Sequence, residues 1–120
     1  MPYVDGFVLP VSRARLDEYR RLAESAAEIF KEHGALEYWE CAGDDLRIEG
    51  MRSFVDMAGA ADDETVVFAW VVYDSREARD AANAKIAADP RMAELMDPSN
   101  PPFDMTRMAY GGFGTLVRSS

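Results

Sequence analysis

Asp5 is the polar residue whose position most invites a chemical role, because it interrupts an otherwise apolar segment near the N-terminus. A carboxylate in a central strand needs a hydrogen-bond or ion-pair partner. If the last strand lies beside the first, that partner is Arg107 or Tyr110. Asp5 is then either a general base or ligand anchor, or part of a structural contact at a subunit seam. Asp5 is therefore the one candidate catalytic residue, with a structural ion pair as the alternative.

Two further carboxylates, Glu37 and Glu40, are three residues apart in a segment with the composition of a strand. Side chains alternate along a strand, so these two lie on opposite faces and only one can face inward with Asp5. A pair of inward carboxylates could divide the roles of acid and base. The alternative, which we favour, is an edge strand whose charges discourage aggregation.

The single histidine and the single cysteine offer little for catalysis. His33 could shuttle protons, but its place in the last turn of a helix favours stabilisation of the helix dipole. Cys41 lies in a strand that supplies no adjacent base, so we interpret it as a buried small apolar residue. One histidine and one cysteine do not make a usual zinc site, and a lone cysteine forms no intrachain disulfide. We expect no metal and no cofactor.

Two other patterns do not form recognisable sites. The acidic segment 44–64 lacks the DxDxDG spacing of a calcium loop. No helix follows Gly111, Gly112 and Gly114, so these glycines are not a dinucleotide-binding fingerprint. They suggest instead a bulge or a close approach of two backbones in the last strand.

The elements that would position these residues follow the order βαββαβ. Pro10 is expected to end the first strand, Ser12 to cap the first helix and Gly34 to end it. Segment 44–64 reads as a long loop with at most an irregular strand or turn at 51–54. Strands are predicted over 3–9, 36–42, 65–73 and 105–117, and helices over 13–33, 76–88 and 90–96.

This order predicts the ferredoxin-like α+β fold, a four-stranded antiparallel sheet with its helices on one face. The strand over 65–73, TVVFAWVVY, is apolar on both faces, although a strand with one wet face should alternate. Leaving the second face in water would expose an unusually large apolar patch. We therefore predict a homodimer joined sheet to sheet, a dimeric α+β barrel. The side chains on that second face are expected to be Val66, Phe68, Trp70 and Val72.

Length and composition set the limits of this interpretation. The chain has 120 residues, 48% hydrophobic and 29% charged, which predicts a single globular domain over 1–120. Its net charge of −9 disfavours nucleic acid and anionic membranes as partners. The N-terminus has no basic region typical of a signal peptide, and the longest apolar run is far too short to cross a membrane. We expect a cytoplasmic protein.

Five segments resemble the YbaA-like family of small bacterial proteins of unknown function. They are YVDGF (3–7), HGAL (33–36), DDETVVF (62–68), SREARDAAN (75–83) and RMAYGGF (107–113). The resemblance spans nearly the whole chain and implies a dimeric α+β barrel with no assigned activity. The wider group of such barrels includes cofactor-free monooxygenases and haem-degrading enzymes, but their catalytic residues have no match here, so that link is an analogy of fold.

Two functional hypotheses follow. In the first, Val4, Gly6 and Val8 face the helices, and the barrel interior binds or converts a small molecule. In the second, the same aromatic side chains fill the barrel, and the dimer is a non-catalytic structural or interaction module. The residues predicted to line the interior are Tyr3, Asp5, Phe68, Trp70, Arg107 and Tyr110.

Overall fold

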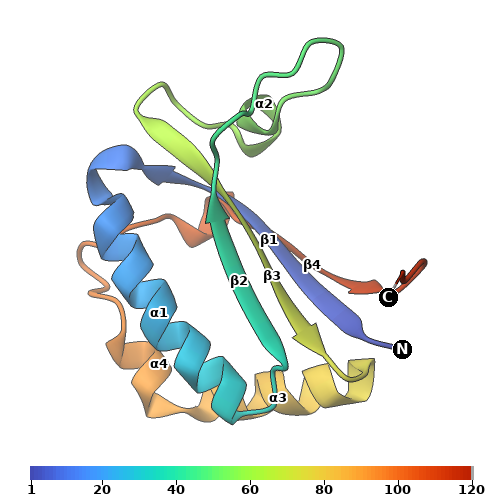
Figure 1. Ribbon diagram of the computed structural model, residues 1–120. Helices are drawn as coiled ribbons and strands as arrows, with labels where there is room; N and C mark the ends of the chain where they lie inside the picture. The colour runs from blue at the N-terminus through green and yellow to red at the C-terminus, as the bar shows by residue number, and fades with distance from the viewer. Residues whose placement is uncertain (120) are drawn as a thin grey trace.

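A four-stranded antiparallel sheet forms the centre of the computed structural model, which describes residues 1–119 (Figure 1). The strand order is β2-β3-β1-β4, so β2 and β4 are the edges. This arrangement confirms the predicted ferredoxin-like α+β fold. The elements are β1 (Tyr3–Ser12), α1 (Leu16–Glu32), β2 (Glu37–Ala42), α2 (Phe54–Ala58), β3 (Glu64–Tyr73), α3 (Arg76–Ala88), α4 (Pro90–Glu94) and β4 (Ala109–Gly114), with 3₁₀ turns at Arg13–Arg15 and Met105–Arg107.

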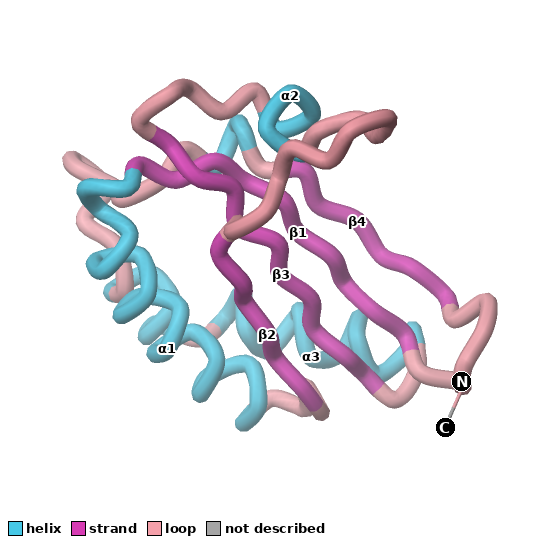
Figure 2. The backbone as a smooth tube through the Cα atoms, turned by 45° about the horizontal axis from the view of Figure 1, so that its top comes forward, coloured by secondary structure: helices cyan, strands magenta, loops and turns pink. Residues whose placement is uncertain are grey.

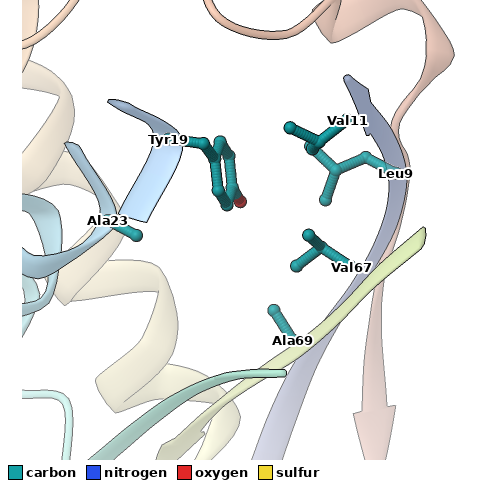
Figure 3. Close-up of a cluster of buried hydrophobic side chains, with 6 residues drawn as sticks. All are labelled: Leu9, Val11, Tyr19, Ala23, Val67 and Ala69. Carbon is teal, nitrogen blue, oxygen red and sulfur yellow. The ribbon is translucent and has the colours of Figure 1, made fainter. Parts of the chain in front are cut away.

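The long helices α1 and α3 lie on one face of the sheet, called here the helix face (Figure 2). Alternate residues of β3 point toward them, and Val67, Ala69, Val71 and Tyr73 are all buried. One part of the core joins β1, β3 and α1, with Tyr19 of the helix packed above the strands (Figure 3). Burial of these side chains supplies the main stabilisation of the fold, about 1.5–3 kcal/mol for each large one.

Helix α1 forms because its apolar residues recur every three or four positions. Tyr19, Ala23, Ala26 and Ile29 are buried on one side of the helix. The helix ends at Glu32 and is followed by Gly34 with φ of +120°, a value that side chains other than glycine rarely adopt. The predicted end of this helix is therefore confirmed.

Several predicted boundaries are wrong. Pro10 lies inside β1, where it pairs with Val66. Strand β4 pairs only with residues 3–8 of β1, so one edge of β1 is free at Pro10. Because no strand lies on that side, the missing N–H of proline removes no hydrogen bond between strands. Ser12 makes no side-chain cap, because a 3₁₀ turn separates it from α1. The predicted loop 44–64 contains α2, which the Ser53 hydroxyl caps.

The last predicted strand is shorter than expected. Residues 105–107 form a 3₁₀ turn, and β4 ends at Gly114. Pairing with β1 runs without interruption from Tyr3↔Gly114 to Val8↔Ala109, so the glycines make no bulge. The close approach at Gly112 is made by a side chain and not by a second backbone, since a Cβ there would collide with the ring and hydroxyl of Tyr3.

The opposite side of the sheet, called here the open face, carries large apolar side chains that no long helix covers. Phe68 is 46% exposed and Phe113 is 61% exposed. Trp39 and Trp70 stack on this face with ring centroids 5.6 Å apart. Val66 is an exception to the prediction, because it is buried where α2 packs on β1 and β3. No helix within residues 1–119 has both the length and the apolar character needed to cross a membrane.

Candidate functional site

Asp5 lies on the helix face, not in the predicted barrel interior. It pairs with Val71, a core residue, and its own exposure is 1%. Phe7 and Leu9 are separated from Asp5 by two and four positions, and they pack into the same core as Val71 or its neighbours. Alternation along β1 therefore carries Asp5 beneath the helices. The predicted orientation of this strand is wrong.

The carboxylate of Asp5 is held by side chains from α3 and β4. Tyr110 donates its hydroxyl to Asp5 Oδ2 at 2.8 Å, and Arg79 Nη1 lies 3.4 Å from Asp5 Oδ1. Arg79 also donates to the Tyr3 hydroxyl at 3.2 Å, with its guanidinium 4.9 Å from the Tyr3 ring centre. We call Tyr3, Asp5, Tyr73, Arg79 and Tyr110 the Asp5 cluster. Its contacts are those that a structural ion pair would make.

Tyr73 and Tyr110 of the Asp5 cluster remain protonated at physiological pH. Burial, and to a smaller degree the charge of Asp5, raise the pKa of Tyr73 well above its usual range. Burial and the hydrogen bond to Asp5 likewise raise the pKa of Tyr110. The Tyr73 hydroxyl and Asp5 Oδ1 are buried without a hydrogen-bond partner among residues 1–119. Tyr110 therefore serves the cluster as a donor and not as a base, whereas the Tyr73 hydroxyl is unpaired among these residues.

The other predicted lining residues do not join Asp5. Arg107 lies in the 3₁₀ turn before β4, where it bonds both oxygens of Glu64 at 2.8 and 2.9 Å and the carbonyl of Gly59 at 2.7 Å. Phe68 lies on the open face, and so does Trp70. The structure therefore brings Tyr3, Asp5 and Tyr110 together and leaves the remaining three elsewhere.

A groove of about 490 Å³ follows the open face. Its lining has no charged side chain. We call it the open-face groove. The residues that line it come from β1, β3, β4 and α2. They include Val4, Gly6, Val8, Met57, Phe68, Trp70 and Phe113.

A second hollow, of about 320 Å³, lies between α1 and β2 on the helix face. Glu40 reaches into it and accepts hydrogen bonds from Tyr19 and, at 2.6 Å, from Tyr38. We call it the α1–β2 cavity. Glu40 thus shares the helix face with Asp5, as one of the two interpretations allowed, but its bonds to two tyrosines were not predicted by the favoured interpretation as an edge-strand charge. Two features of the sequence could have indicated this contact. Tyr38 and Glu40 are two residues apart and so lie on the same face of the strand, and Tyr19 belongs to the apolar stripe of α1 that packs on the sheet.

Glu37 and Cys41 lie on the open face of β2. Trp39 donates its indole N–H to Glu37 at 3.1 Å, so the two glutamates do lie on opposite faces as predicted. Cys41 pairs with Phe68 and is exposed, so its predicted burial is wrong. The reason is that β2 is an edge strand, with no long helix over its open side.

His33 links α1 to α4. Its Nε2 lies 2.8 Å from Asp89 Oδ2, and Asp89 also caps α4 by accepting from the backbone N–H of Arg91 at 3.0 Å. Hydrogen bonds from Arg91 and His33 hold the pKa of Asp89 well below its usual range. These contacts tie two helix ends together. Within residues 1–119, no group of three or more histidine, cysteine and acidic side chains is arranged to hold a metal ion.

Comparison with known proteins places this geometry in a family and a fold. The family model DUF1428, described as a protein of unknown function, matches residues 2–105. The uncharacterized protein YbaA of Escherichia coli K12 is 45% identical over 117 residues, which cover 98% of each chain.

Among solved structures, an uncharacterized NIPSNAP domain protein from Burkholderia xenovorans superposes with a TM-score of 0.60 at 13% identity, covering 98% of both chains. A putative antibiotic biosynthesis monooxygenase from Nitrosomonas europaea gives 0.59 at 13% identity, covering 99% of this chain and 94% of the other. At such identities the likeness concerns the fold. The family model and the near-full-length identity to YbaA confirm the predicted resemblance. This chain therefore belongs to the DUF1428 family.

Proposed function

We propose that this chain forms a homodimer through its open face, and that the open-face groove then becomes an interior cavity for a small apolar molecule. The observation that carries the proposal is the uncharged, apolar lining of this groove, on a face of the sheet that neither α1 nor α3 covers (Figure 2). A second copy of the chain is the occupant that best matches that surface, because two such faces are complementary about a two-fold axis. The likeness to a monooxygenase extends to the fold alone, so the proposal rests on the groove.

In a single chain, large apolar side chains of the open face are left in water. Phe68, Trp39 and Phe113 are each 46–61% exposed. Burying the rest of each large apolar side chain would contribute part of the 1.5–3 kcal/mol that full burial gives, roughly 1 kcal/mol apiece. Lone apolar residues on a surface need no explanation, but a continuous groove of them marks an interaction site. The charged residues of this acidic chain do not line the groove, so repulsion between two copies is not focused there.

The alternative is a dimer whose interior is filled. Phe68, Trp70 and Phe113 are bulky, and six such side chains from two copies could occupy the whole space. The protein would then be a structural or interaction module with no ligand in the barrel.

The dimer is tested by placing a charge on the open face. Phe68→Asp should convert a particle of twice 13.4 kDa into one of 13.4 kDa, measured by light scattering after size-exclusion chromatography. Phe68 is already partly exposed, so the folded single chain should tolerate the change. Leu36→Asp is the matched control. Leu36 is 53% exposed and precedes β2, and by alternation it shares the side of Tyr38, so this variant should stay dimeric. A wild-type particle of 13.4 kDa would contradict the proposal.

The interior cavity is tested with p-xylene, an apolar probe without hydrogen-bond donors, followed by ligand-observed NMR. We expect saturable binding to the wild-type dimer and its loss in Phe68→Asp. A dimer that does not bind p-xylene would favour the filled barrel.

A further inference from the structure

The α1–β2 cavity combines an apolar wall with one half-buried carboxylate, that of Glu40. Leu16, Ala23 and Ala27 of α1 and Val67 of β3 supply apolar surface, while Glu40 projects from β2. Figure 1 shows α1 running beside β2, so one helix and one edge strand form the two sides. A volume of about 320 Å³ lies at the lower end of the range for small-molecule sites. The cavity can therefore hold a small organic molecule.

The hydrogen-bonding capacity left at Glu40 consists of acceptors. The Tyr19 hydroxyl donates to Oε1 and the Tyr38 hydroxyl donates to Oε2, so each tyrosine has used its only O–H proton. The two phenolic oxygens keep their lone pairs, and a carboxylate accepts about four hydrogen bonds in all. Burial, followed by the charge of Glu40, raises the pKa of both Tyr19 and Tyr38, which keeps both hydroxyls protonated. A molecule that binds here must bring the hydrogen-bond donors.

The charge of the site favours a cation. Glu40 has no basic side chain within 4.0 Å in the part of the chain that the structure describes, residues 1–119. Arg20 and Glu24 also line the cavity, but the Arg20 side chain is 59% exposed and pairs with Glu24 at 2.9 Å and Asp17 at 3.5 Å. A partly buried carboxylate without a counter-charge is costly, and a ligand cation would relieve that cost. The net charge of −9 also attracts cations.

We propose that the α1–β2 cavity binds a small organic ammonium ion, whose charged head donates hydrogen bonds to Glu40 and Tyr38 and whose apolar body lies between α1 and β2. This site is separate from the open-face groove, because Glu40 and the groove lie on opposite faces of the sheet. The inference goes beyond the proposed dimer and does not depend on it.

The test compares three probes of nearly equal shape. Phenethylamine carries the ammonium head, phenethyl alcohol a neutral donor, and 3-phenylpropionate a negative charge. Titration of the full chain near neutral pH should show saturable binding of the amine, weaker binding of the alcohol and none of the carboxylate. Glu40→Gln should weaken amine binding at least about thirtyfold, because the charge pair is lost. The variant keeps an acceptor and gains a donor, so both tyrosines retain a partner.

Glu37→Gln is the matched control. It makes the same chemical change on the same strand but on the open face, and amine binding should be unchanged. Ala27→Leu provides a second variant that leaves Glu40 untouched. It fills the cavity from α1 with a residue that favours helix, so amine binding should disappear while the folded state persists.

Three results would overturn the inference. They are equal affinity of wild type and Glu40→Gln for the amine, equal affinity of wild type for amine and alcohol, and no saturable amine binding by wild type up to about 5 mM. The open-face variant Phe68→Asp separates the two proposals. Amine binding should survive in that variant, whereas dimerisation and p-xylene binding should be lost.

Discussion

Tyr73 carries a buried hydroxyl that the fold does not use. Its exposure is 0%, and within residues 1–119 the hydroxyl has no hydrogen-bond partner. Tyr73→Phe removes this polar group without changing the ring, so the free energy of unfolding should stay equal or rise, by up to about 1–3 kcal/mol. Urea denaturation measures the change.

Tyr110→Phe is the companion variant and should behave in the opposite way. Its hydroxyl donates to Asp5 at 2.8 Å, so losing it should lower the free energy of unfolding by about 1–3 kcal/mol. If Tyr73→Phe were the more damaging of the two, the description of the Asp5 cluster would be wrong.

At this scale, sequence reasoning located the important residues better than their surroundings. The predicted partner of Asp5 was Arg107 or Tyr110, and Tyr110 is the one that is hydrogen-bonded to it. The predicted face of Asp5 was wrong. Phe7 and Leu9 lie on the same face of β1 as Asp5, and their large apolar side chains could have indicated that this face is the buried one. Arg79 was missed because nothing local to α3 reveals which strand residue lies beneath it. Contacts such as that between Arg79 and Asp5 depend on the position and orientation of the helix on the sheet.

Asp89 joins two elements, since it caps α4 and contacts His33 at the end of α1. Its pKa in the folded protein is depressed, so the ionised form stabilises the fold at every pH above the pKa of an unfolded aspartate, about 3.9. That contribution is lost as the pH falls toward the folded pKa. The difference in Tm between wild type and Asp89→Asn should therefore be constant above about pH 5 and shrink below about pH 4.

Thermal melts between neutral and acid pH measure this effect. Asp17→Asn is the control, because Asp17 and its partner Arg20 are 81% and 59% exposed and an exposed ion pair contributes little. A difference in Tm for Asp89→Asn that grew toward acid pH would contradict the assignment.

Elements with a repeating pattern were predictable, and those fixed by packing were not. The apolar stripe of α1 and the Ser75 cap of α3 were visible in the sequence, and Ser75 does accept from Ala78 at 3.0 Å. Helix α2 has only five residues, too few to show a period of 3.6, and its contacts with β1 and β3 hold it in place. Pro10 was wrongly predicted to end β1. The sequence of β1 alone does not show that β4 stops short of Pro10 and leaves that edge of the strand free.

The proposed dimer has a thermodynamic signature that belongs to the whole molecule. If folding and association are linked, the melting temperature depends on protein concentration. A tenfold rise in concentration should raise the Tm of wild type by about 3 °C for an assembly of this size, and that of Phe68→Asp should not change. Differential scanning fluorimetry with an extrinsic dye over two decades of concentration measures this. A wild-type Tm that is independent of concentration would contradict linked dimerisation.

The ferredoxin-like arrangement followed from the order of elements, and the uncovered sheet face followed from the lack of alternation in TVVFAWVVY. The α1–β2 cavity could not be predicted, because its volume depends on how far α1 stands from an edge strand. Hollows of this kind arise from tertiary packing and leave no periodic trace in the residues.

The stacked pair Trp39 and Trp70 has an optical consequence. These are the only two tryptophans of the chain, and their rings are nearly parallel, at 12°. All of the indole emission therefore originates from one spot on the open face, and the pair should act as an exciton-coupled chromophore in circular dichroism. Tryptophan fluorescence and circular dichroism should therefore respond to binding or association on the open face, and not to binding on the helix face.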